Sequence, residues 1–227
     1  MRDHPRVHRV LTVVSTALIT AGIIVLADVG ITLAWQEPVS SIYGAIQQQR
    51  AERELDDVER SFLDRPLPDV DGLTGAKAAR KLADAFEDDL ESGNAIGRIE
   101  AAAMDLDAVI VEGIGTATLQ KGPGRYPRTA LPGQGGTIGI AGHRTTYLAP
   151  FREIDEIEDG EAIVVEMPYG TFTYQVSNAK IVDPSEVEVV RDVGREQVVL
   201  TTCHPEYSAA ERYVAFGRLT EITLTGS

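Results

Sequence analysis

The amino-acid sequence predicts an all-β domain, a sandwich or a barrel, that follows an N-terminal transmembrane helix and a helical stalk. Three observations predict this arrangement: a long charge-free apolar run near the N-terminus, a polar stretch rich in helix-forming residues, and a series of short β-branched runs separated by turn residues. We expect a cytoplasmic tail over residues 1–9, an anchor over 10–35, a stalk over 36–94 and the β domain over 95–227.

The anchor is predicted by the run VLTVVSTALITAGIIVLA at residues 10–27, which carries no charge. Its length is near the roughly 20 apolar residues that a helix needs to cross a bilayer, and it exceeds the ~7–15 apolar residues of a cleaved signal peptide. Three arginines precede the run and favour a cytoplasmic N-terminus, and Trp35 suits the outer interface. We therefore expect a single-pass protein of the cell membrane, with everything after Trp35 outside.

The stalk is predicted by the segment IYGAIQQQRAERELDDVERSFL, which mixes helix-forming residues and charges around a thin apolar stripe. The stripe consists of Ile42, Ile46, Leu55, Val58 and Phe62. After a break rich in Pro, Gly and Asp, the segment AKAARKLADAFEDDLESG predicts a second helix that ends at Gly93. We expect a spacer that lifts the next domain from the membrane, and partner binding through the stripe is the alternative.

The β domain is predicted by the runs DAVIVEG, GTIGIAG, EAIVVEMPYGTFTYQVSNAKIV, QVVLTTC and RYVAFGRLTEITL. Each run is rich in Val, Ile, Thr, Tyr or Phe, the residues that favour strands. Within the third run, Pro168, Tyr169 and Gly170 predict the turn of a hairpin. About 130 residues are enough for one barrel with its own core.

Charge and cysteine content narrow the possible functions. The net charge of −14 argues against a nucleic-acid partner, because phosphate binding needs a basic face. Cys203 is the single cysteine, so an exported chain cannot form an internal disulfide. The thiol is therefore inert in the core, paired with another molecule, or reactive.

A reactive thiol needs a base nearby, and two histidines follow the predicted anchor. His204 is adjacent in sequence, but neighbouring side chains on a strand point to opposite faces. His143 follows the run GTIGIAG, where a strand gives way to a loop, and it meets Cys203 if the two strands are neighbours. His143 is therefore the better candidate, although loop hydrogen bonding also explains a lone histidine at such a position.

An arginine completes the group of candidate catalytic residues. Arg212 opens the next apolar run, nine positions after Cys203, and an antiparallel return would bring it back beside the thiol. A guanidinium is always charged and offers several donors, which suits an oxyanion or a peptide carbonyl. Pairing with Glu206 or Glu211 at the surface explains Arg212 equally well.

The segments GHRTTY at His143, VLTTCHP at Cys203 and RYV at Arg212 resemble the sortases, the membrane-anchored cysteine transpeptidases of Gram-positive bacteria. The likeness extends over most of residues 95–224 and is greatest to the class E sortases of actinobacteria. It implies a sortase-like closed β-barrel with short helices. One departure is the stretch Ala101–Ala103, where sortases often have an isoleucine-proline step, and this puts the local edge of the substrate groove in doubt.

The resemblance implies a nucleophilic Cys203, a general acid and base in His143, and an Arg212 that positions the substrate and stabilises the oxyanion. The implied reaction cleaves a C-terminal sorting motif of the Leu-Pro-x-Thr-Gly or Leu-Ala-x-Thr-Gly type between Thr and Gly, and joins the Thr carboxyl to an amine. The implied partners are surface proteins that carry the motif, and a cell-wall precursor of the lipid II type or a pilin that supplies the amine. Thr201, Thr202 and Tyr147 are expected to contact the substrate.

No cofactor or metal is expected. The glycines of GQGGTIGIAG precede a strand where a nucleotide site requires a helix and a lysine, and neither histidine has a second ligand at metal-binding spacing. The acids of REIDEIEDGE could bind calcium, but they look more like a solvated helix and turn. Two alternatives to a sortase stay open: another cysteine acyltransferase of the cell wall, such as an L,D-transpeptidase, and a non-catalytic tethered β domain that binds a partner.

Overall fold

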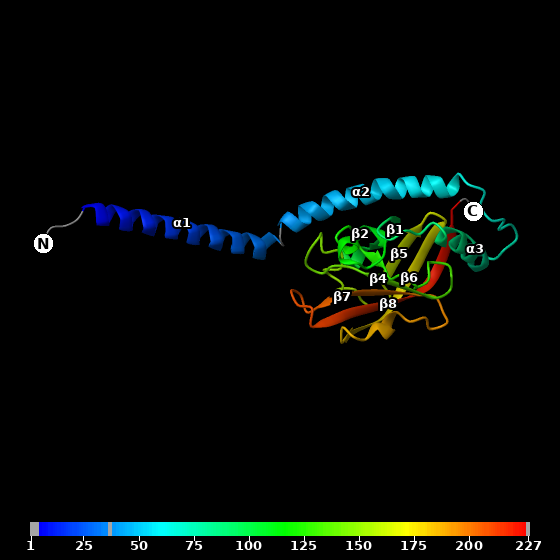
Figure 1. Ribbon diagram of the computed structural model, residues 1–227. Helices are drawn as coiled ribbons and strands as arrows, with labels where there is room; N and C mark the ends of the chain where they lie inside the picture. The colour runs from blue at the N-terminus through cyan, green and yellow to red at the C-terminus, as the bar shows by residue number, and fades with distance from the viewer. Residues whose placement is uncertain (1–4, 36–37, 226–227) are drawn as a thin grey trace.

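Eight strands form a closed barrel in the computed structural model, which describes residues 5–35 and 38–225 (Figure 1). The strands are β1 (Ala95–Ala101), β2 (Leu106–Glu112), β3 (Gly124–Arg125), β4 (Thr137–Ala141), β5 (Ala162–Met167), β6 (Gly170–Val182), β7 (Gln197–His204) and β8 (Glu211–Leu224). The helices are α1 (Pro5–Trp35), α2 (Pro38–Leu63), α3 (Gly75–Glu87) and α4 (Thr116–Leu119), with 3-10 turns η1 (Ala102–Met104) and η2 (Val187–Val190). The predicted all-β barrel is thus confirmed.

The order of strands around the barrel is β1-β2-β3-β4-β7-β8-β6-β5, and β5 closes onto β1. The pairs β2–β3 and β4–β7 are parallel, and the other neighbours are antiparallel. Closure gives every strand a hydrogen-bonded neighbour on both sides, which limits pairing with another chain. The parallel β4–β7 pair also sets the carboxyl ends of two strands side by side.

All the strand runs expected from the sequence form strands. The predicted hairpin turn is also present, since Met167 pairs with Gly170 across β5 and β6. The strands β1 and β3 were not anticipated. Gly97, Arg98 and Glu100 interrupt the apolar pattern of β1, and β3 has only two residues, too few for a readable period.

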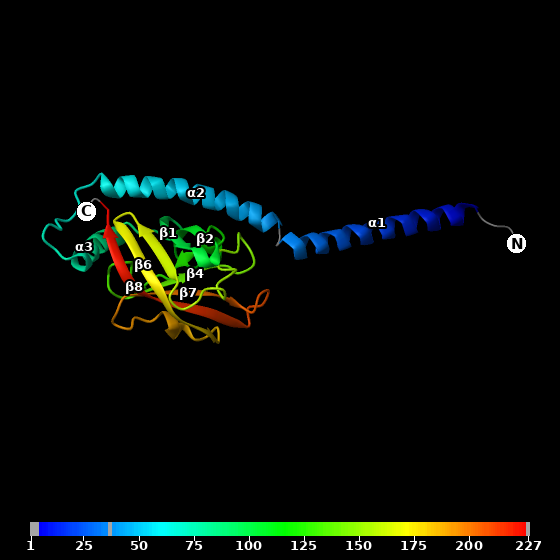
Figure 2. The ribbon, with the colours of Figure 1, turned by 180° about the vertical axis from the view of Figure 1, so that it is seen from behind.

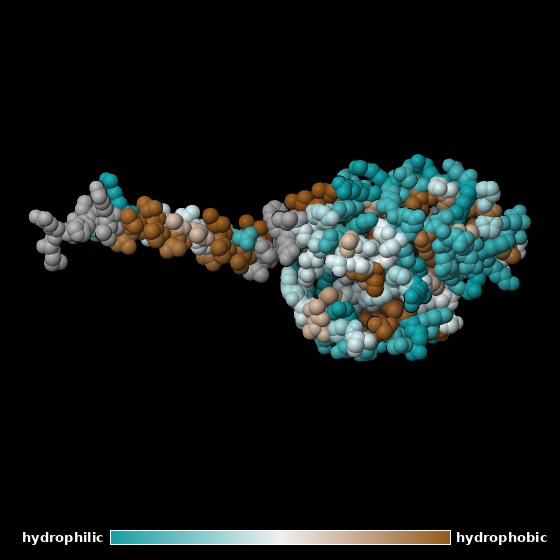
Figure 3. All heavy atoms as spheres, viewed as in Figure 1, coloured by the Kyte–Doolittle hydropathy of each residue, from teal (hydrophilic) through white to brown (hydrophobic). Residues whose placement is uncertain are grey.

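The helix α1 extends away from the barrel, and its side chains over residues 8–31 are exposed (Figures 1 and 2). Figure 3 shows this helix as a largely apolar rod joined to a mostly polar body. Within the described residues, His8–Ile31 is the one helix long and apolar enough to cross a membrane. Residues 1–4 of the expected cytoplasmic tail and the side chain of Trp35 lie outside what the structure describes.

The expected stalk does not stand free of the barrel. In Figures 1 and 2, α2 lies along β1 and β2, and α3 lies beside the end of β8. Phe62 of α2 and Phe86 of α3 are about 1% exposed and pack on each other and on Tyr169, with ring centroids 5.4–6.1 Å apart. Burying such aromatic rings stabilises by about 1.5–3 kcal/mol each. Both helices therefore belong to the folded body.

The predicted stripe on α2 is only partly buried. Leu55 and Phe62 enter the core, whereas Ile42 and Ile46 stay 63% and 46% exposed, and the unremarked Ala51 is buried against Val109 of β2. The helix predicted to end at Gly93 ends at Glu87. The acidic run that follows Phe86 is unfavourable at a helix C-terminus, where the helix dipole attracts cations.

Candidate active site

The carboxyl ends of β4 and β7 bring His143 and Cys203 to one end of the barrel. The parallel register pairs Ala141 with Thr201, so His143 and Cys203 occupy equivalent positions two residues further along. Two hydrogen bonds extend the pairing past the end of β4: Gly142 N donates to Thr201 O at 3.1 Å, and Thr202 Oγ1 donates to Gly142 O at 2.7 Å. The backbone beside both side chains is therefore fixed.

Arg212 reaches the same place from the opposite side of β7. In the antiparallel β7–β8 pair, Cys203 lies directly opposite Arg212. Side chains of directly opposed residues share a face, with Cβ atoms about 4.5–5.5 Å apart. The Arg212 guanidinium donates from Nη1 to the carbonyls of Ala209 and Glu211, at 3.1 and 2.9 Å. It is thus held over the β7–β8 turn on the side of Cys203.

The His143 imidazole is suited to accepting a proton. Burial lowers its pKa below the ordinary value of 6.5, so the neutral ring is favoured at neutral pH. Its Nε2 atom is buried and has no hydrogen-bond partner within the described residues. Buried polar atoms are nearly always satisfied, so this nitrogen is open to a hydrogen bond from a substrate group or from solvent. The ring packs against Tyr147, with centroids 5.2 Å apart.

His204 is engaged elsewhere. Its Nδ1 lies 2.9 Å from Arg144 Nη1, and because arginine only donates, Nδ1 must accept. The neutral His204 ring then carries its proton on Nε2 and leaves no lone pair to serve as a base. It also tilts over Tyr213, 5.9 Å between centroids, on the face of β7 that Cys203 does not share.

Arg144 has a structural place that the sequence did not reveal. Its side chain is 5% exposed, and besides His204 it pairs with Asp155 at 2.6 Å. The residue after His143 is therefore bonded to the residue after Cys203. The sequence signal was weak: an arginine next to a histidine, with acids downstream that looked like a solvated turn.

Comparison with known proteins identifies the family. The sortase domain model matches residues 99–220, more than half of the chain. The chain belongs to the sortase family.

Relatives of this sortase include sortase D of Bacillus subtilis, 35% identical over 132 residues, and SrtE1 of Streptomyces coelicolor, 32% identical over 147 residues. These matches cover 56% and 58% of the chain but only 65% and 42% of the relatives' lengths. A crystal structure of sortase E1 from Streptomyces coelicolor, with a tripeptide in its active site, superposes with a TM-score of 0.57 at 28% identity. That match covers 61% of this chain and 96% of the other. The predicted family and its class E likeness are confirmed.

The three residues expected to contact substrate make contacts inside this sortase. Thr201 Oγ1 lies 2.9 Å from Tyr126 Oη, and Thr202 Oγ1 bonds Gly142 O. Both threonines are under 5% exposed, and the Tyr147 ring sits between His143 and the N-terminal part of α2. Their contact with substrate stays a prediction.

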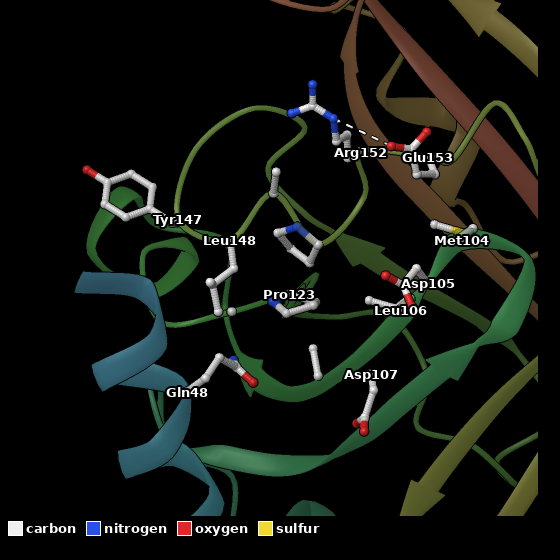
Figure 4. Close-up of a pocket in the computed structure, with 14 residues that line it drawn as sticks. Gln48, Met104, Asp105, Leu106, Asp107, Pro123, Tyr147, Leu148, Arg152 and Glu153 are labelled. Carbon is white, nitrogen blue, oxygen red and sulfur yellow. Dashed lines mark ion pairs between the residues drawn. The ribbon is translucent and has the colours of Figure 1, made fainter. Parts of the chain in front are cut away.

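A pocket of about 270 Å³ adjoins the site on the side of Tyr147. Figure 4 shows Gln48 of α2 and Leu148 on one side, and Asp105 and Glu153 on the other. The stretch Ala101–Ala103, which departs from the family pattern, ends β1 and begins the turn η1, and the residues from Met104 to Ala108 form one wall of this pocket. Over residues 5–35 and 38–225, no cluster of three or more His, Cys, Asp or Glu side chains could hold a metal ion.

Proposed function

We propose that this sortase is a membrane-anchored cysteine transpeptidase that cleaves a sorting motif of the Leu-Pro-x-Thr-Gly or Leu-Ala-x-Thr-Gly type between Thr and Gly. One observation carries the proposal: the β4–β7–β8 ladder sets the single thiol beside the strand end that carries His143 and directly opposite Arg212. Family membership rules out the L,D-transpeptidase alternative.

The proposed reaction has two steps. The Cys203 thiol passes its proton to neutral His143 as the sulfur attacks the Thr carbonyl carbon. The Thr–Gly C–N bond then breaks while the protonated His143 gives this proton to the leaving amine. A thioester then links the Thr carboxyl to Cys203. An incoming amine attacks the thioester and loses a proton to His143, and the C–S bond breaks as His143 returns this proton to the sulfur, which regenerates the Cys203 thiol. Arg212 donates hydrogen bonds to the oxyanion in both steps.

The first test is a transpeptidation assay with the full chain in detergent, because α2 and α3 supply part of the barrel's core. Peptides carrying either motif are incubated with triglycine, and mass spectrometry follows the acyl adduct on Cys203 and the joined product. We expect both species, and Cys203→Ala and His143→Ala to abolish the product. Arg212→Ala should lower kcat/KM by about 10²–10³-fold, as loss of an oxyanion donor does.

Arg218 provides a matched control for Arg212. It lies on the same strand and its side chain is exposed. Arg218→Ala should keep kcat/KM within about twofold, because surface substitutions are usually near neutral. Neither adduct nor product from a folded sample would contradict the proposal and favour a non-catalytic tethered domain.

We further propose that α1 is the anchor, that the N-terminus is cytoplasmic, and that the barrel lies outside the cell, where motif-bearing surface proteins and a cell-wall precursor or pilin amine meet it. The single cysteine allows a direct test. A membrane-impermeant maleimide applied to intact cells should label Cys203, and Cys203→Ala should remove the label. Labelling that requires lysis would place the barrel on the other side.

A further inference from the structure

The helix that follows the apolar span touches the loop that follows His143. Gly44 of α2 is buried against this loop, and a Cβ added there would lie 2.9 Å from the Tyr147 carbonyl carbon and 3.1 Å from its Cα. Real Cβ atoms essentially never approach a backbone carbon this closely. The glycine is therefore required for the helix and the loop to pack as they do.

Aromatic contacts continue from α2 to the imidazole. The Tyr43 ring of α2 packs edge-on against Tyr147, with centroids 6.1 Å apart, and Tyr147 packs on His143 at 5.2 Å. Such pairs contribute about 0.5–1.5 kcal/mol beyond the area they bury. Tyr147 thus lies between the helix and the imidazole and contacts both.

The loop itself has an unusual backbone. Three successive residues, Tyr147, Leu148 and Ala149, have φ values of 52°, 67° and 47°, in the left-handed region. Each such non-glycine residue costs about 1–2 kcal/mol and persists only where surrounding contacts impose it. Three contacts hold the loop in this conformation: the hydrogen bond from Phe151 N to His143 O at 3.0 Å, the hydrogen bond from Ala149 N to Thr146 O at 2.8 Å, and the packing of α2 against the loop.

We propose that Tyr147 is a positioning residue for His143 and that α2, through Gly44 and Tyr43, holds Tyr147 in place. The effect of this positioning on catalysis rests on the proposed function, whereas the placement of the His143 ring by Tyr147 does not depend on the substrate. The helix adjoining the membrane anchor then sets where the catalytic imidazole sits.

The first experiment substitutes the glycine in the full-length protein in detergent. Gly44→Ala should push the loop by a few tenths of an ångström and lower kcat about 3- to 30-fold with KM little changed, since misplacement by about 1 Å can cost 10²-fold. The matched control is Gly75→Ala in α3, where the added Cβ meets nothing within 4 Å, and kcat should be unchanged. Equal kcat in both variants would overturn the role of α2.

The second experiment separates the ring of Tyr147 from its hydroxyl. Tyr147→Phe keeps the packing and should retain kcat, whereas Tyr147→Ala should lose it by about tenfold or more. A rise in KM at constant kcat for Tyr147→Ala would instead show a substrate contact and overturn the positioning role. Thermal unfolding of each variant confirms that the fold is retained.

The third measurement needs no substrate. The His143 imidazole is titrated by NMR, with His143→Gln assigning its signal among the four histidines of the chain. Burial lowers the pKa of His143, so Tyr147→Ala and Gly44→Ala should raise it toward 6.5, while Tyr147→Phe should not. If no peptide is cleaved but the pKa of His143 changes in these variants, the proposed function is wrong and the positioning role of Tyr147 is supported. An unchanged pKa of His143 in the folded Tyr147→Ala variant would overturn the positioning role of Tyr147.

Discussion

The bond between Arg144 and His204 ties together the two residues that follow the proposed base and nucleophile, and replacing Arg144 tests its strength. Arg144→Met keeps an unbranched side chain in a site that is 5% exposed but removes both polar contacts. A hydrogen bond that involves a charged group contributes about 1.5–3 kcal/mol. The pair with Asp155 adds at most about 1 kcal/mol, because that carboxylate is 43% exposed and water screens it. The expected loss of stability is therefore about 1.5–4 kcal/mol.

A double-mutant cycle isolates the Arg144–His204 part of this loss. Guanidinium chloride unfolding of the full chain in detergent is measured for Arg144→Met, His204→Phe and the double variant. We expect a coupling energy of about 1.5–3 kcal/mol. Arg191→Met is the control: its ion pair with Glu188 is 73% exposed on the arginine side, so it should change stability by under about 0.5 kcal/mol. A coupling below about 0.5 kcal/mol would refute the reasoning.

Three further predictions concern the barrel and its pH dependence. Arg125→Met should lower the free energy of unfolding by about 3–5 kcal/mol in chemical unfolding, because it leaves the buried Glu112 carboxylate, which Arg125 pairs with at 2.7 and 2.9 Å, without its partner. The double variant with Glu112→Leu should recover most of this loss, and a double variant as unstable as the single one would contradict the prediction. Burial lowers the pKa of His143, so as pH falls below 6.5 the unfolded chain binds a proton at this residue more readily than the folded chain, and the melting temperature should fall. His143→Gln should make the fall of melting temperature with pH shallower, and an unchanged pH dependence would refute the linkage. Gly142→Ala would place a Cβ 2.7 Å from the fully buried Phe151 ring and should lower the stability measured by thermal unfolding by about 1–3 kcal/mol. An unchanged melting temperature would contradict this prediction.

Local chemistry predicted most of the arrangement at the candidate active site. The β-branched runs predicted where most of the strands lie. Because adjacent residues of a strand point to opposite faces, the sequence also predicted that the side chains of Cys203 and His204 point apart. The position of His143 at the end of a strand made it the candidate partner, and the nine-residue return predicted that Arg212 would face the thiol. These inferences need only the period of a strand and short connections.

Contacts between distant segments could not be predicted in this way. The Arg144–His204 bond depends on the parallel register of β4 and β7, which no local pattern encodes. The packing of α2 depends on Gly44 and Ala51, small residues that look like gaps in an apolar stripe but allow close approach. A stripe judged by large residues alone therefore suggested a free stalk.

The contact between α2 and the loop after His143 also limits the distance between the candidate active site and the end of α1. Ser40 Oγ lies 3.5 Å from Tyr147 N, and Ser40 is five positions beyond Trp35. The loop is therefore within roughly 25 Å of the end of α1, even for a fully extended chain. In Figures 1 and 2, the end of the barrel that carries the β7–β8 turn also faces α1. If α1 is the proposed anchor, donors and acceptors tethered to the same membrane surface would meet the thiol by lateral diffusion, at effective concentrations on the order of millimolar. Under the proposed function, a weak affinity for free peptide would then be sufficient, and the height at which a substrate presents its reactive group would become part of its specificity.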